Sequence, residues 1–139
     1  MEHPALLAAN WEKFKKIMLQ GKLRRKVKEA IASVISYDNK CNYCVAAHSA
    51  ALRSMKVGES EITAMFQGTF PDDFTNKEAA LVNFARRANL DWHSIVNADL
   101  KELVSLGIDE SEMLEALGTM ELFIAFNRFA DVMGIEIDF

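Results

Sequence analysis

The scarcity of residues that interrupt a helix is the feature that most limits what this chain can fold into. Its 139 residues include only two prolines and six glycines, and most of the glycines separate segments whose apolar residues recur at helical spacing. Leu23, Val27 and Ile31, for example, are spaced four residues apart, which places them on one face of a helix. This pattern predicts an all-α fold of about seven helices joined by short connections.

Start and stop signals set the bounds of these helices. Pro4 suits a first helical turn, and Gly107 suits the position after a last one. Thr75 and Asp109 each precede a glutamate by three residues, which is the pattern of a capping box. These signals predict helices over residues 4–20, 22–35, 40–55, 59–67, 75–89, 97–106 and 109–133.

The ends of the third helix are expected to follow local residue preferences. Asp38 and Asn39 are suited to cap its start, and Gly58 is expected to end it. The last helix differs from the others because apolar residues such as Leu117 and Phe123 fall on more than one of its sides. We therefore expect it to be buried centrally or shared with another subunit of an oligomer.

Size and composition favour one globular domain over residues 1–139. Half of the residues are hydrophobic and 26% are charged, which excludes a disordered chain. Asn10, Glu121 and Asn127 interrupt the most apolar stretches, so no membrane-spanning helix is expected. Glu2 stands where a signal peptide carries lysines, and we therefore predict a cytoplasmic protein.

Net charge argues against a surface built to hold nucleic acid, because the chain carries a charge of -4. One stretch is nevertheless basic and contains no acid: Lys13, Lys15, Lys16, Lys22, Arg24, Arg25, Lys26 and Lys28. These residues are expected to lie on the solvated faces of two helices, and docking of an acidic partner is the alternative.

The residues that carry chemistry are Cys41, Cys44 and His48. At the start of the third predicted helix these side chains share one face, with Cys44 between the other two. A helix N-terminus lowers the pKa of a thiol, and a nearby imidazole can take its proton. Cysteines three residues apart can also close a disulfide, which gives a two-electron redox cycle within one turn.

Two other interpretations of this motif stay open. Cysteine is often simply a buried apolar residue, and the pair could be structural. A zinc site would use Cys41, Cys44 and His48 as three ligands, but a fourth would have to come from His3 or His93, which fall in an end and a loop. We expect thiol chemistry that uses neither a metal nor a cofactor.

The motif formed by Glu29, Cys41, Cys44 and His48 resembles the signature of the carboxymuconolactone decarboxylase family, specifically its alkylhydroperoxidase D-like branch. Residues 74–85 and 123–131 resemble later helices of the same family, so the resemblance covers most of the chain from about Glu29 to Met133. The lactone decarboxylases that give the family its name generally lack the cysteine pair, which argues against decarboxylation here.

This resemblance implies an all-helical fold that assembles into homotrimers or homohexamers and reduces peroxides or exchanges disulfides. It also implies that Glu29 joins His48 in a proton relay, while Cys41 and Cys44 cycle between dithiol and disulfide. The expected partners are a hydroperoxide substrate and a dithiol, thioredoxin-like or lipoyl-type electron donor. The best-known member has a second histidine between the cysteines, where this chain has Tyr43.

The sequence leaves two questions open. His48 favours Cys44 as the attacking thiol, whereas the start of a helix favours Cys41. The main rival to an enzyme is a binding or assembly protein whose cysteines sense redox state without turnover. His93 is expected to be an ordinary surface histidine.

Overall fold

The fold consists of helices packed around one central helix. The computed structural model describes residues 3–137, and within them every regular element is helical. The elements are α1 (Pro4–Met18), α2 (Arg25–Asp38), α3 (Asn42–Ser54), α4 (Glu59–Phe66), α5 (Asn76–Leu90), the 3-10 turn η1 (Trp92–Ser94), α6 (Asn97–Ser105) and α7 (Glu110–Met133). The all-α prediction is therefore confirmed.

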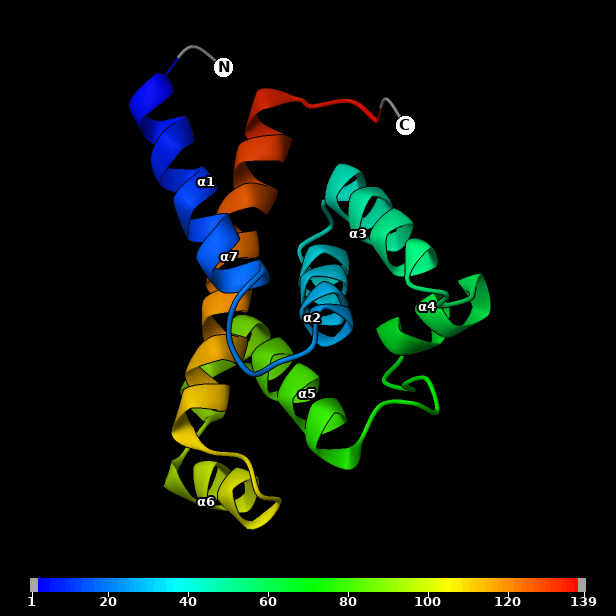
Figure 1. The fold of residues 1–139 in the computed structure, drawn as a ribbon, viewed down its shortest axis with the longest axis vertical. Coiled ribbons are helices and arrows are strands. Elements are labelled where there is room, and N and C mark those ends of the chain that lie inside the picture. The colour runs from blue at the N-terminus through cyan, green and yellow to red at the C-terminus, as the bar shows by residue number, and fades with distance from the viewer. Residues whose placement is uncertain (1–2, 138–139) are drawn as a thin grey trace.

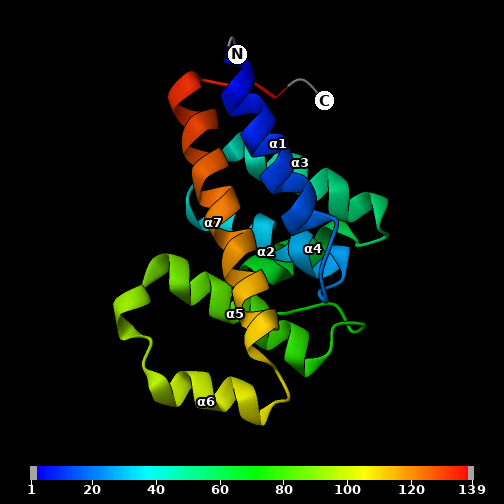
Figure 2. The ribbon, with the colours of Figure 1, turned by 60° about the vertical axis from the view of Figure 1, so that its left-hand side comes forward.

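The central helix is α2, which packs against α3, α4, α5 and α7. Ten consecutive residues of α2, from Val27 to Ser36, are buried. The long helix α7 runs beside α1 along one side of the molecule, and α3 and α4 cover the other side of α2 (Figures 1 and 2). Apolar residues occur on several sides of α7 because it contacts α1, α2, α3 and α5 along its length.

Five helices end in the same hydrogen-bond pattern, the Schellman motif. At the end of α2, the Lys40 N–H donates to the Tyr37 carbonyl at 3.1 Å and the Cys41 N–H donates to the Ser36 carbonyl at 3.0 Å. The motif needs a residue with positive φ, which Gly107 supplies after α6 but Lys40 supplies after α2. Helix α3 likewise ends with Lys56 at positive φ, so the predicted stop at Gly58 is wrong.

The junction between α2 and α3 also differs from the prediction. Helix α2 continues to Asp38, and neither Asp38 nor Asn39 caps α3. The Asp38 carboxylate instead accepts two hydrogen bonds from Arg86 of α5, at 2.6 and 2.7 Å. A contact with a distant helix therefore overrides the local capping preference.

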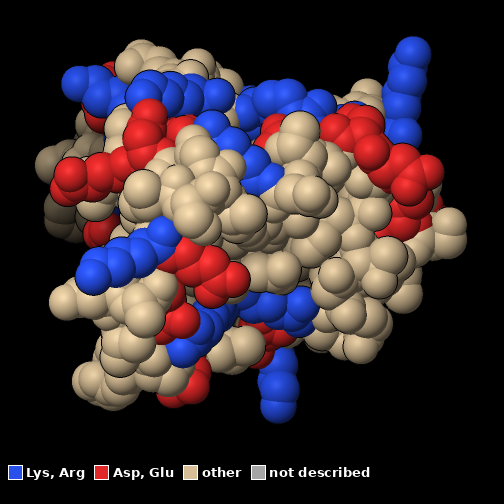
Figure 3. Space-filling model, turned by 90° about the horizontal axis from the view of Figure 1, so that it is seen from below, with Lys and Arg blue, Asp and Glu red and all other residues tan. Residues whose placement is uncertain are grey.

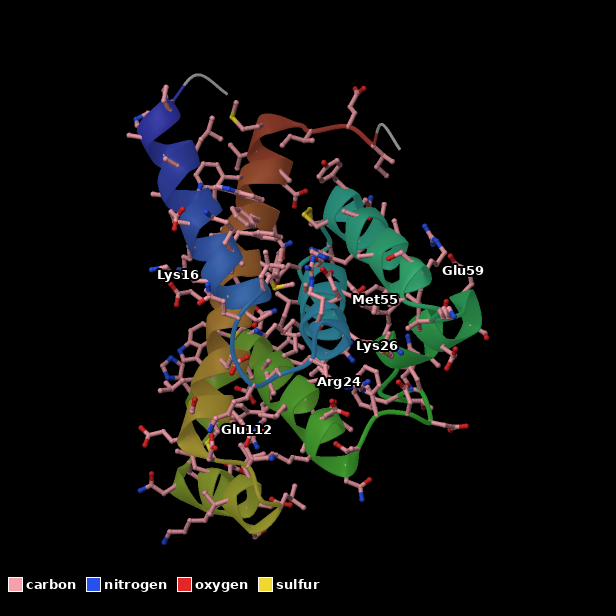
Figure 4. All side chains as sticks on the ribbon, viewed as in Figure 1. Lys16, Arg24, Lys26, Met55, Glu59 and Glu112 are labelled. Carbon is pink, nitrogen blue, oxygen red and sulfur yellow. A yellow bond between two sulfur atoms is a disulfide. The ribbon has the colours of Figure 1, made fainter. Side chains whose placement is uncertain are left out.

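The basic stretch contributes internal ion pairs. Apart from Lys16, each of its residues pairs with a carboxylate: Lys13 with Glu121, Lys15 with Glu12, Lys22 with Asp109, Arg24 with Glu78 and Asp73, Arg25 with Glu29, Lys26 with Asp73, and Lys28 with Glu115. Lys and Arg residues lie beside acidic ones on the face in Figure 3, and Figure 4 shows Arg24 and Lys26 at the start of α2. Most of the positive charge of this stretch is therefore paired with carboxylates of the same chain.

Lys28 is the most deeply buried of these cations, with 1% of its surface exposed. Its ammonium pairs with Glu115 of α7 at 2.9 Å and donates to the backbone carbonyls of Ile17 and Gln20. The Glu115 carboxylate also accepts hydrogen bonds from the N–H groups of Lys22 and Leu23. These two residues therefore precede α2, although the prediction placed them in that helix. Gly21 suits this position because its φ of +103° is rare for other residues, and a Cβ there would also displace the Glu115 carboxylate.

Among the described residues, no helix combines the length and the apolar character needed to cross a membrane.

We predict that Glu115→Ala lowers the free energy of unfolding by about 3 to 5 kcal/mol, because it leaves the Lys28 ammonium buried without its carboxylate. Urea unfolding followed by circular dichroism measures this loss. The matched control is Glu121→Ala on the same helix, whose pair with Lys13 is exposed and should contribute several-fold less. Equal losses in the two variants would contradict this account of Lys28.

Candidate functional site

The start of α3 places the two cysteines together. Cys41 is the N-cap residue of α3, and its N–H donates a hydrogen bond to the Ser36 carbonyl near the end of α2. Cys44 lies in the first turn of α3, with its Cα 5.3 Å from that of Cys41, and the two sulfurs form a disulfide. In the reduced state, the N–H groups of this turn would stabilise a thiolate at either position.

The two sulfurs differ in access to solvent. Cys41 has no exposed surface, whereas Cys44 keeps 6% of its surface and lines a cavity. Both cysteines pack with Ala130 of α7, and Tyr43 covers this cluster. An external molecule would therefore meet Cys44 first.

His48 is fixed by contacts with two neighbouring helices. Its Nδ1 lies 2.8 Å from Oε2 of Glu29 on α2. Its ring packs edge-to-face with Phe123 of α7, with the ring centroids 4.4 Å apart. Because His48 follows Cys44 by four residues on α3, its ring lies on the helix face that carries the thiol.

Glu29 is a buried carboxylate with a different partner on each oxygen. Oε2 meets His48, and Oε1 accepts hydrogen bonds from Nε and the terminal nitrogen of Arg25 at 3.0 and 2.8 Å. Burial alone would raise the pKa of the Glu29 carboxyl, but His48 and Arg25 outweigh that effect and hold this pKa below its ordinary value. Glu29 is therefore an anion that can accept a hydrogen bond from Nδ1–H of His48.

Side chains near the end of α2 hold the backbone that leads to Cys41. The Asn127 amide of α7 donates to Ser36 Oγ and accepts from Asn39, each at 3.0 Å. Asn39 in turn accepts a hydrogen bond from Asn89 of α5 at 2.9 Å. These contacts connect the end of α2 with α5 and α7, next in sequence to Cys41.

A cavity of about 400 Å³ opens beside Cys44 and His48. It lies between α1, α3 and α7, and its lining residues are Leu7, Asn10, Trp11, Phe14, Tyr43, Cys44, Ala47, His48, Phe123, Phe126, Phe129, Ala130 and Ile135.

The structure brings Glu29, Cys41, Cys44 and His48 together, as the motif requires. Sequence reasoning missed Arg25 and Asn127, although the spacing of four residues between Arg25 and Glu29 was a usable signal for an ion pair on a helix. His93 is exposed, and His3 caps α1 by accepting from the Leu6 N–H. Residues 3–137 contain no group of three or more His, Cys, Asp or Glu side chains placed to hold a metal ion.

The sequence model of the family described as "Carboxymuconolactone decarboxylase family" matches residues 4–87. The chain belongs to this family. The resemblance stated from the motif is thus confirmed, and the match includes α1, α2 and α3, which carry two walls of the cavity and the cysteine motif. Comparison with curated proteins gave no match.

Solved structures share the fold of this family member. An uncharacterized peroxidase-related protein from Silicibacter sp. TM1040 has 23% identity and a TM-score of 0.86, over 98% of this chain and 72% of the other. A second, an uncharacterized peroxidase-related protein from Ralstonia eutropha JMP134 described as an alkylhydroperoxidase AhpD core, has 24% identity and a TM-score of 0.86 over the same shares. A variant of the debrominase Bmp8, in complex with 2,3,4-tribromopyrrole, has 22% identity and a TM-score of 0.83 over 99% of this chain and 73% of its own.

The buried carboxylate predicts how stability changes with pH. Because Glu29 has a lowered pKa in the folded chain, it contributes stability above its ordinary pKa of 4.5, and this contribution is lost as the pH falls through the lower folded value. The stability difference between wild type and Glu29→Gln should therefore stay nearly constant from about pH 7 to about pH 5 and shrink as the pH falls below 4.5.

Urea unfolding at several pH values measures this difference. Glu121→Gln removes an exposed carboxylate of the same kind and serves as the control, whose difference from wild type should stay nearly constant. A difference that stays constant over the whole pH range for Glu29→Gln would mean that these contacts do not lower the pKa of Glu29.

Proposed function

We propose that this protein is a thiol-dependent peroxidase or disulfide reductase that uses Cys41 and Cys44 with Glu29 and His48. One observation carries the proposal: the disulfide at the start of α3 is followed on the same helix by His48, whose Nδ1 is hydrogen-bonded to the buried carboxylate of Glu29. A purely structural disulfide would need no such proton acceptor beside it.

The proton relay follows from the Glu29 anion. The Glu29 carboxylate accepts a hydrogen bond from Nδ1–H of His48, which fixes the neutral tautomer with its lone pair on Nε2. Nε2 can then take the proton of the Cys44 thiol, and the imidazolium formed is stabilised by Glu29. Arg25 neutralises Glu29 in the resting state and keeps one of its oxygens directed to His48.

The redox steps balance with a hydroperoxide and a dithiol. The Cys44 thiolate attacks the terminal peroxide oxygen, the O–O bond breaks, and the alkoxide leaves as an alcohol with the proton held by His48. The Cys41 thiol then attacks the sulfenic sulfur, forming the disulfide and releasing water. A dithiol donor returns two electrons and two protons through a mixed disulfide.

The greater access of Cys44 supports it as the first attacker and as the sulfur that the donor meets. Acting as a disulfide reductase, the same pair would exchange with an external disulfide in place of a peroxide. We further propose a thioredoxin-like or lipoyl-type donor in the cytoplasm and a homotrimeric or homohexameric assembly.

A second candidate is reductive removal of a halide from an aromatic ring. The aromatic lining beside Cys44 favours it, as does the fold shared with a debrominase. In this reaction the dithiol is oxidised to the disulfide, the ring gains hydrogen, and hydrogen halide is released. Release of bromide from a bromopyrrole by reduced protein would distinguish it from peroxide reduction.

We predict many cycles of cumene hydroperoxide reduction when reduced protein is supplied with excess dithiothreitol. Cys44→Ser should abolish turnover, and His48→Gln should lower kcat/KM by about 10² to 10⁴, the usual contribution of a positioned acid or base. The control is Ser54→Ala, which alters a residue at the far end of α3. Wild-type protein that stops after one equivalent of peroxide per disulfide would identify a redox sensor.

Sulfenic acid trapping tests the order of attack. After one equivalent of hydroperoxide, Cys41→Ser should form a dimedone adduct at Cys44, whereas Cys44→Ser should form little adduct at the buried Cys41. Mass spectrometry of the tryptic peptides locates the adduct. An adduct that forms only at Cys41 would reverse the order given above.

A further inference from the structure

The cavity beside Cys44 has the dimensions of a small-molecule site. Its volume of about 400 Å³ falls in the usual range of roughly 300 to 1,000 Å³. Its inner end is formed by the nearly buried residues Cys44, Phe123 and Ala130, with 6%, 3% and 5% of their surfaces exposed.

The walls of the cavity are apolar and rich in aromatic rings. None of the lining residues carries a permanent charge, and only Asn10, Trp11, Tyr43 and His48 supply oxygen or nitrogen atoms from their side chains. An anion or a polar peptide would lose hydration there without gaining partners. The aromatic lining instead favours a flat or bulky hydrocarbon group.

Helix α1 supplies the outer wall through Leu7, Trp11 and Phe14, spaced four and three residues apart. The Trp11 ring stacks on Phe14 with centroids 5.6 Å apart, yet 57% of Trp11 remains exposed. Helix α1 is attached mainly to α7, beside which it runs in Figures 1 and 2. Trp11 therefore lines the cavity from α1 and keeps much of its surface exposed, although its ring also meets Phe14 and the Lys15 ammonium, 5.8 Å from the ring centroid.

We propose that this cavity binds the aromatic group of the substrate between α1 and α7, and that Trp11 determines the preference for it over small polar substrates. The inference rests on the proposed function, since it places the reacting oxygen of an aryl-substituted hydroperoxide at Cys44. A compound such as cumene hydroperoxide carries its peroxide one carbon from the ring, so ring binding and attack by Cys44 involve adjacent parts of one molecule.

Binding can be measured without turnover. The chain has two tryptophans, Trp11 and Trp92, so Trp92→Phe leaves Trp11 as the only tryptophan reporter. Titration of the oxidised Trp92→Phe protein with cumyl alcohol, the product of cumene hydroperoxide, should change its fluorescence to saturation. Trp11→Phe should show no such change, because Trp92 lies in η1 and does not line the cavity.

Specificity is measured by the ratio of kcat/KM for cumene hydroperoxide to that for hydrogen peroxide. Trp11→Ala should lower this ratio about threefold to tenfold, the equivalent of one aromatic contact. Trp92→Ala is the matched control, because Trp92 is 59% exposed against 57% for Trp11, and it should leave the ratio unchanged.

The outcomes separate this inference from the proposed function. Saturable binding without any turnover would support the cavity as an aromatic site and overturn the peroxidase. Turnover with equal ratios in Trp11→Ala and Trp92→Ala would overturn the role of Trp11 and leave the peroxidase standing. If cumyl alcohol does not bind and Trp11→Ala changes only the sedimentation mass, the cavity is an interface between copies of this chain, and the inference is wrong.

Discussion

Two opposite charges buried side by side on α2 determine how the other helices are arranged. Lys28 and Glu29 are 1% and 2% exposed, and a buried charge is tolerated only where partners compensate it. Since adjacent helix residues point in different directions, the two side chains reach different neighbours. Lys28 reaches the connection after α1 and Glu115 of α7, whereas Glu29 reaches His48 of α3.

These two sets of contacts position the opposite walls of the cavity. Lys28 holds the end of α1, whose aromatic residues form the outer wall, and Glu29 fixes His48 beside the reactive pair. Both walls are therefore positioned relative to each other by side chains of α2. A change to either charge should therefore affect the stability of the fold and also the position of the α1 wall of the cavity relative to the Cys44 sulfur.

The sequence predicted what depends on local pattern and missed what depends on distant contacts. Helical spacing indicated the fold, and the capping boxes at Thr75 and Asp109 are present. The end of α2 was misplaced because Lys40, which has no sequence signal for positive φ, takes the position usual for glycine. Spacing predicted Cys41, Cys44 and His48, but Glu29 came only from the family motif, since its partner lies nineteen residues away.

The residue between the cysteines limits the chemistry further. Tyr43 has no ring nitrogen, so it does not supply the imidazole base that a histidine in that position would place beside the thiols. Among the residues that line the cavity, His48 is the only imidazole. The proposed relay must therefore pass through His48 and Glu29 alone, and Tyr43 adds to the wall of the cavity instead. In this chain the residue between the cysteines is thus part of the cavity lining and packs against the disulfide.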